Sequence, residues 1–164
     1  MKYADTKDMI KIVSSICQKQ GSRLTETRQH VLEVLFKLDT PVSAYELTEQ
    51  YNLHIDLPIM AMSVYRILDF LESIRLVHCI HSINKYIICH HVGDICKQHP
   101  PVFLICKSCH HIQEFELSKE LEAAFSIQVE NAGFLSAGSQ IELNSLCENC
   151  KSTADQICSG DTHD

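Results

Sequence analysis

The chain has 164 residues, of which 45% are hydrophobic and 21% are charged, and this balance indicates a globular rather than a disordered protein. No apolar run approaches the roughly 18 residues of a membrane-spanning helix, and the polar N-terminal segment does not resemble a signal peptide. We therefore expect a cytoplasmic protein without a membrane partner. Its nine cysteines are then expected to be metal ligands or buried thiols rather than disulfides.

The net charge of −7 is unevenly distributed along the chain. Residues 1–81 carry nine Lys and Arg against ten Asp and Glu, whereas residues 82–164 carry five against eleven. The acidity therefore belongs to the second half, and the total charge does not exclude a basic, nucleic-acid-binding face on the first half.

Four helical segments are predicted first, in residues 6–21, 25–38, 43–51 and 63–74. Gly21 is expected to end the first helix, and Ser43 with Glu46 forms a capping-box pattern at the start of the third. Ser63 is the expected N-cap of the fourth. The residues predicted to face the core are Met9, Ile12, Val13, Ile16, Val31, Leu32, Leu35, Leu38, Val64, Ile67, Leu68 and Leu71.

Two β-rich runs follow the helices, in residues 76–80 and 84–89, and are predicted to form a hairpin. Short helices followed by a hairpin are typical of a winged helix, in which the last helix reads a DNA groove, and also of a generic small helical domain. On that last helix Tyr65, Arg66 and Asp69 are expected to point outward. Such a Tyr-Arg pair suits contacts to phosphates and base edges, although a solvated face has the same pattern.

The second half predicts a ββαβ unit, with strands in residues 100–106, 111–117 and 139–147 and a helix in residues 118–133. The helix is expected to be capped by Ser118 and ended by Gly133. The whole chain is therefore expected to have an α+β fold. Because about sixty residues bury little core, this unit is expected to dimerise through its sheet or helix.

The strongest chemical signal is a pair of C-x₂-C motifs, "CKSC" at 106–109 and "CENC" at 147–150. Four thiolates in two such motifs can bind one tetrahedral zinc ion and leave no coordination position open. The paired spacing argues against four unrelated buried cysteines. We therefore predict a structural, non-catalytic metal site that joins the two ends of the ββαβ unit.

A second group of potential metal ligands is more diffuse, and seven of the ten histidines lie between residues 78 and 111. His78 and Cys89 are potential cross-strand neighbours on the hairpin. Cys17 and Cys79 are expected to be buried thiols. The candidate ligands are His78, Cys79, His81, Cys89, His90, His91, Cys96, His99, His110, His111 and Glu114.

Six segments carry a resemblance to a known family: "RLTETRQHVLEVL", "VSAYEL", "SVYRILDFL", "LVHCIHSINKYIICHH", "FLICKSCHHIQEFE" and "LCENC". Over about residues 6–150 the chain resembles the ferric-uptake-regulator (Fur) superfamily, and within it the zinc-uptake-regulator (Zur) branch. The resemblance implies a bacterial transcriptional repressor, not an enzyme, that binds operator DNA as a homodimer. It also implies two zinc ions per subunit, one structural and one regulatory, and no other small-molecule substrate.

The resemblance assigns roles to individual residues and segments. It places the structural zinc on Cys106, Cys109, Cys147 and Cys150, the regulatory zinc on His78, Cys89, His99 and Glu114, and DNA contacts on Tyr45 and Arg66, with Arg28 and Tyr65 as further candidates. It implies a winged-helix DNA-binding domain in residues 1–90, a hinge and metal loop in 91–101 and a dimerisation domain in 102–151. The tail in 152–164 is expected from its own residues to be disordered, although Cys158 and His163 could bind metal.

Several departures from the family pattern keep alternatives open. The second helix lacks the usual proline after Thr25, and "IMAMSVYR" replaces the usual "P-x-T-V-Y-R". Cys96 and His90 are rivals of His99 as ligands. The "HHxH" of iron sensors is absent, and one thiolate with imidazoles and a carboxylate suits Zn²⁺ better than iron. An iron or peroxide sensor, or a zinc-storage protein or zinc enzyme, remains the alternative, but no HExxH motif supports an enzyme.

Overall fold

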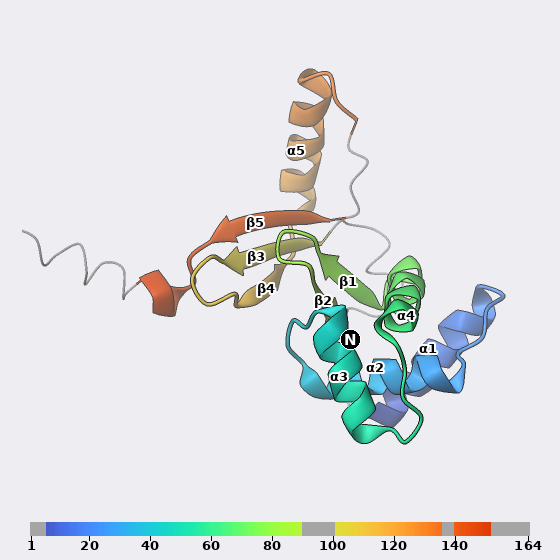
Figure 1. Ribbon diagram of the computed structural model, residues 1–164. Helices are drawn as coiled ribbons and strands as arrows, with labels where there is room; N and C mark the ends of the chain where they lie inside the picture. The colour runs from blue at the N-terminus through green and yellow to red at the C-terminus, as the bar shows by residue number, and fades with distance from the viewer. Residues whose placement is uncertain (1–5, 90–100, 136–139, 152–164) are drawn as a thin grey trace, which may run out of the picture. The chain divides into compact units, whose positions relative to one another are not determined.

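The computed structural model describes residues 6–89, 101–135 and 140–151, and the chain divides into two compact units, Met1–Ile95 and Cys96–Asp164 (Figure 1). The fold is α+β, with helices and a hairpin in the first unit and a small mixed sheet in the second. In the described ranges, no helix combines the length and the apolar character needed to cross a membrane.

The first unit begins with four helices, α1 (Thr6–Lys19), α2 (Glu26–Leu38), α3 (Ala44–His54) and α4 (Ala61–Ser73). Most of the predicted core residues are buried, including every one predicted on α4. On α1 the buried residues are Met9, Val13 and Cys17, spaced four apart, so that Ile12 and Ile16 are only half-buried. Ile16 and Leu38, although half-buried, still pack against the core, as predicted, whereas Ile12 does not belong to that group.

The ends of these helices follow local backbone chemistry. Gly21 adopts the left-handed conformation (φ +66°) just after α1, and the N–H of Ser22 returns to the carbonyl of Cys17 (2.9 Å). The predicted capping box of Ser43 and Glu46 is present at the start of α3. The prediction of Ser63 as an N-cap was wrong, because α4 starts earlier and its N-cap is Met60.

A two-stranded antiparallel hairpin follows the helices, as predicted, and consists of β1 (Val77–Ile80) and β2 (Lys85–Ile88). Val42, which precedes α3, forms a β-bridge with Tyr86 through two backbone hydrogen bonds of 3.1 and 2.7 Å. This bridge attaches the hairpin to the start of α3. The first unit thus has the winged-helix arrangement rather than that of a generic helical domain.

The second unit contains β3 (Val102–Cys106), β4 (Ile112–Phe115), α5 (Lys119–Asn131) and β5 (Ile141–Ser145), which confirms the predicted ββαβ order. The strand order is β4-β3-β5, in which β3 pairs antiparallel with β4 and parallel with β5 (Figure 1). Ser118 caps α5 through its side chain, as predicted, and Gly133 has φ +81° just after the helix. No residue of α5 is buried, so the helix contributes little to the core of its own unit.

Candidate metal centre and nucleic-acid interface

The two C-x₂-C motifs come together at one end of the three-stranded sheet. Because β3 and β5 are parallel, both strands end at the same edge, where Cys106 pairs with Ser145. Cys109 lies in the turn after β3, and Cys147 and Cys150 follow β5. The four sulfur atoms lie within 4.8 Å of one another, and in the described part of the chain they form the only such group of three or more potential ligands.

Backbone hydrogen bonds hold the thiols in place. The N–H of Cys147 donates to Cys106 Sγ (3.4 Å), and Cys109 Sγ lies 3.6 Å from Cys147 Sγ. His110 adopts a left-handed conformation (φ +58°), and its N–H closes the first motif by donating to the Cys106 carbonyl (2.9 Å). The second motif is closed by a 3.0 Å bond from the Cys150 N–H to the Cys147 carbonyl. The turn of each motif is therefore fixed by a hydrogen bond within its own backbone.

These contacts set the protonation of the thiols. Hydrogen bonds from the backbone N–H groups of Cys147 and then Cys109 lower the pKa of Cys106 to about 6, so that it is a thiolate at neutral pH. The Ser108 hydroxyl lowers the pKa of Cys150, but the nearby thiols of Cys147 and Cys109 outweigh it and raise that pKa to about 12.

The donor chemistry therefore fits a divalent, thiophilic cation. Four sulfurs at these separations cannot all carry negative charge unless a cation neutralises them. They match the closed tetrahedral sulfur set of structural zinc sites, in which no position is left for water or substrate. Such a site can join strands, but it cannot supply a reactive metal-bound water.

Two residues of the predicted regulatory set lie on the hairpin. His78 is opposite Ile87, and the N–H of Cys89 donates to the Leu76 carbonyl (2.8 Å), which extends the ladder by one pair. Cys89 is therefore a diagonal neighbour of His78 on the same face of the hairpin. Both side chains are buried, with His78 8% exposed and Cys89 completely buried. The hairpin thus carries two of the four predicted ligands, a buried imidazole and a buried thiol, on one face.

The remaining members of that set are not brought together by the described residues. Glu114 is half-buried on β4, opposite Phe103, and belongs to the second unit. His99 and its rivals Cys96 and His90 lie outside the described residues. The regulatory set therefore stays a prediction. Cys17 and Cys79 are buried, as predicted.

Three of the four residues predicted to contact DNA, Tyr45, Tyr65 and Arg66, are on α3 and α4. Tyr45 is 65% exposed on the first turn of α3, and its ring meets that of Tyr65 edge to face with centroids 6.1 Å apart. Arg66 and Asp69 are exposed, as predicted, but the prediction that Tyr65 points outward was wrong in part, because Tyr65 is half-buried and packs against the core. An exposed tyrosine and an exposed arginine therefore lie on two helices that an aromatic contact joins.

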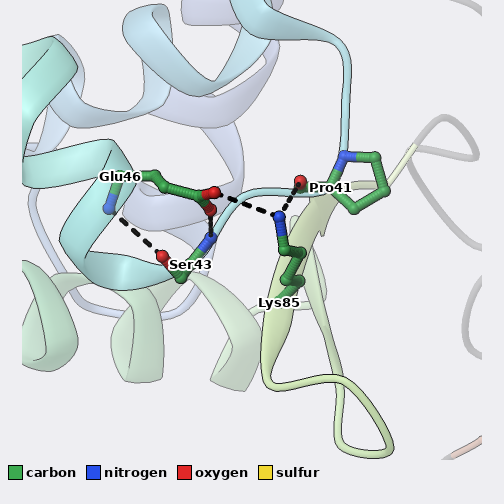
Figure 2. A network of polar contacts seen from close by, with 4 residues as sticks. All are labelled: Pro41, Ser43, Glu46 and Lys85. Carbon is green, nitrogen blue, oxygen red and sulfur yellow. Dashed lines mark hydrogen bonds and ion pairs between the residues drawn. The ribbon is translucent and has the colours of Figure 1, made fainter. Parts of the chain in front are cut away.

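A polar network fixes the start of α3 against the hairpin (Figure 2). The N–H of Ser43 donates to Glu46 Oε2 (2.6 Å), and Lys85 Nζ lies 3.2 Å from Glu46 Oε1 and 3.4 Å from the Pro41 carbonyl. The Ser43 N–H bond, and to a lesser degree the Ser43 hydroxyl and Lys85, lower the pKa of Glu46. Sequence reasoning found the capping box but not Lys85, because that contact spans 39 residues.

Arg28, one of the two weaker DNA-contact candidates, makes contacts within the first unit. Its guanidinium carbon lies 3.5 Å from the centre of the Phe70 ring on α4, and its Nη1 donates to the Arg23 carbonyl (2.9 Å). A cation over an aromatic face is a stabilising contact. Arg28 therefore joins α2 to α4, a role that sequence reasoning missed.

Comparisons with known proteins agree with this architecture. The family model described as ferric uptake regulator family matches residues 19–144, which is more than half of the chain. The zinc uptake regulation protein of Escherichia coli strain K12 is 29% identical over 150 residues, covering 92% of this chain and 85% of that protein.

Two solved structures are similar over nearly the whole chain. The crystal structure of holo XcZur is 30% identical, with a TM-score of 0.73, and covers 90% of this chain and 99% of that one. A zinc uptake regulator complexed with zinc and DNA is 27% identical, with a TM-score of 0.76, and covers 93% and 99%. With its winged helix, its four-cysteine cluster and a family match across both units, this chain belongs to the ferric uptake regulator family.

Proposed function

We propose that this protein is a zinc-responsive transcriptional repressor that binds operator DNA as a homodimer when its regulatory zinc site is filled. The observation that carries the proposal is the combination, in one chain, of a winged helix with exposed Tyr45 and Arg66 and a closed cluster of four thiols. The similarity to a regulator described as complexed with zinc and DNA supports the same conclusion. We propose no enzymatic role, because a hydrolytic zinc needs an open position.

In this proposal Cys106, Cys109, Cys147 and Cys150 hold the structural zinc. Bound there, zinc supplies a tetrahedral attachment point for four thiolates. The cysteines join the ends of β3 and β5, which are neighbouring strands from distant parts of the sequence. They would thereby stabilise a sheet whose helix has no fully buried residue.

The regulatory zinc is proposed to bind His78, Cys89, His99 and Glu114. The buried positions of His78 and Cys89 on one face of the hairpin support the choice of these two ligands. The four residues come from the hairpin, the segment that follows it, and β4. Binding all four would fix the winged helix relative to the second unit, and this would set the spacing of two recognition helices in a dimer. Such coupling between metal and DNA is typically about 1–3 kcal/mol and is reciprocal.

On the DNA side, α4 is proposed as the recognition helix. Arg66 on α4 and Tyr45 on α3 are proposed as the main DNA contacts, with Tyr65 and Arg28 as lesser ones. The exposure of Arg66 and Tyr45 supports this order. We assign DNA binding to residues 1–90, the hinge to 91–101 and the tail to 152–164.

Dimerisation is proposed for residues 102–151. The second unit leaves many large apolar side chains about half exposed or more, which is unusual for a surface that faces only water. A second copy of the chain would cover them through a two-fold interface. The exposed residues are Phe115, Leu121, Phe125, Ile127, Phe134, Leu135, Leu143 and Leu146.

The test is DNA binding by the purified full-length protein at fixed salt, with zinc or with a chelator that removes only the weaker-bound metal. We expect zinc to raise the affinity for a selected duplex at least tenfold, and Cys89→Ser to abolish this rise while the protein stays folded. Cys79→Ser is the matched control, because Cys79 is a buried cysteine of the same hairpin outside the proposed ligand set. Equal affinity with and without zinc would refute the proposed switch.

A further inference from the structure

The start of α4 exposes two methionine side chains. Met60, the N-cap residue, is 78% exposed and Met62 in the first turn is 65% exposed. On the opposite face of the same helix Val64 is completely buried. The methionines are therefore not core residues, although methionine is an apolar side chain that ordinarily fills cores.

Met62 continues the face of α4 that carries the proposed DNA contact Arg66. Met62 and Arg66 are four residues apart on α4, so they are neighbours on the helix surface. The first turn of α4 contains no acidic residue, and Arg66 is exposed one turn later. The face therefore offers apolar tips beside a cation and the positive end of a helix dipole.

The backbone that carries the methionines is held in place by the end of α3. The Asn52 side chain accepts from the Ile59 N–H (2.8 Å) and donates to the Ile59 carbonyl (3.1 Å). The Met60 carbonyl in turn accepts from the N–H groups of Ser63 (2.8 Å) and Val64 (3.2 Å). Met60 and Met62 thus project from an ordered backbone tied to α3, which is the condition for a specific contact.

One occupant matches this combination of charge and apolar surface. In the DNA major groove the 5-methyl group of thymine is the apolar feature that distinguishes base pairs, and it is flanked by phosphates that attract cations. An apolar protein partner would not require the neighbouring arginine or the acid-free helix start. The face therefore fits thymine-containing DNA better than a hydrophobic protein surface.

We propose that Met62 reads thymine 5-methyl groups in the operator and so contributes sequence specificity beyond that of Arg66 and Tyr45. This inference rests on the proposed function, because it requires α4 to enter the major groove. Burial of one methyl group is worth on the order of threefold to fivefold in affinity. The contact is therefore a determinant of specificity rather than the main source of affinity.

The test uses the zinc-loaded full-length protein and a duplex selected by this protein from a random-sequence pool. Each thymine of that duplex is replaced in turn by uracil, which removes only the 5-methyl group. We expect the wild-type protein to lose threefold to fivefold in affinity at one or more positions. Met62→Ala should bind the thymine and uracil duplexes at those positions equally, and Met62→Leu should discriminate between them again. Leu53→Ala, which alters a 74% exposed apolar side chain of α3, is the control and should discriminate as the wild type does.

The outcomes separate this inference from the proposed function. Zinc-independent binding of the selected duplex would refute the proposed function before any uracil is introduced. Zinc-dependent binding with no sensitivity to uracil, or a Met62→Ala protein that discriminates as the wild type does, would overturn the methionine readout alone. Because Met62 is exposed, the variants should unfold at the wild-type temperature, and this measurement confirms that any change in discrimination is not a folding defect.

Discussion

The backbone N–H of Cys147 donates a hydrogen bond of 3.4 Å to the sulfur of Cys106, a residue 41 positions earlier in the chain. This contact exists because β3 and β5 are parallel neighbours that end at the same edge of the sheet. It lowers the pKa of Cys106 and brings the second cysteine pair to the first. The register of the sheet and the geometry of the four-cysteine cluster are therefore linked.

Replacing Cys147 with serine should remove the structural zinc and destabilise the second unit. A structural zinc can contribute roughly 10–16 kcal/mol to folding, and loss of one of four thiolates removes a large part of this. The measurements are metal content by mass spectrometry and thermal unfolding. Cys17→Ser, at a buried cysteine outside the cluster, should keep its zinc. Unchanged zinc content in Cys147→Ser would contradict the assignment.

Glu46→Gln should destabilise the protein at neutral pH but not in acid. The pKa of Glu46 is lowered, chiefly by the Ser43 N–H, so the carboxylate's stabilisation is present above its ordinary value of 4.5 and is lost as the pH falls through the lowered value. Because Glu46 is half-exposed, we expect only about 0.5 kcal/mol at pH 7. Denaturant unfolding of both proteins between pH 3 and 7 measures the difference.

The control for this experiment is Glu49→Gln, which alters an exposed carboxylate on the same helix. Its unfolding free energy should follow that of the wild type at every pH. A difference between wild type and Glu46→Gln that persists unchanged at pH 3 would show that the charge of Glu46 is not the cause.

Arg28→Ala should mainly lower the stability of the fold, whereas Arg66→Ala should mainly weaken DNA binding. Loss of the Arg28 contact with Phe70 should cost about 0.5–2 kcal/mol of unfolding free energy. Loss of exposed Arg66 should leave stability within about 0.5 kcal/mol of wild type but weaken DNA binding by about 1–3 kcal/mol. Denaturant unfolding and duplex titration separate the two.

Arg28→Ala should also be tested together with Phe70→Leu in a double-mutant cycle. The coupling energy isolates the contact between these two side chains from other effects of either substitution. A coupling near zero would show that the guanidinium and the ring do not stabilise the fold together. Arg23→Ala is a further control, because only the backbone carbonyl of Arg23 contacts Arg28.

Phe125→Asp should shift the protein from dimer to monomer at micromolar concentration. Phe125 is 47% exposed on α5, and a charge at that position would be desolvated in an apolar interface. Sedimentation velocity measures the change. Gln128→Asp introduces the same charge at an exposed polar position of α5 and should affect the dimer less. Equal dimer fractions in wild type and Phe125→Asp would exclude α5 from the interface.

Features that depend on neighbouring residues were predictable from the sequence. The capping box at Ser43, the glycine end of α1 and the turns of both C-x₂-C motifs are decided within a few residues, and all of them are present. The hairpin and the ββαβ order also followed from hydrophobic pattern and turn residues. The four-cysteine cluster was predictable because two C-x₂-C motifs in one chain are typical of a tetrahedral metal site and rarely occur as unrelated buried cysteines.

Features that depend on distant residues were not predictable in the same way. The start of α4 was placed at Ser63 because serine is a common cap, but the bonds between Asn52 and Ile59 end the preceding loop and the helix begins at Ala61. Likewise, nothing near Arg28 in the sequence indicates that it lies over Phe70. Tertiary contacts of this kind override local propensity.

The parallel pairing of β3 and β5 also limits when the sheet can form during synthesis on the ribosome. Cys106 and Cys109 are translated well before β5. The strand that brings the second cysteine pair to them follows β4 and the whole of α5. Until Cys147 and Cys150 have been translated, the first cysteine pair can offer a metal only half of the ligands. Under the proposed assignment, all four ligands of the structural zinc are therefore available only late in the synthesis of each chain.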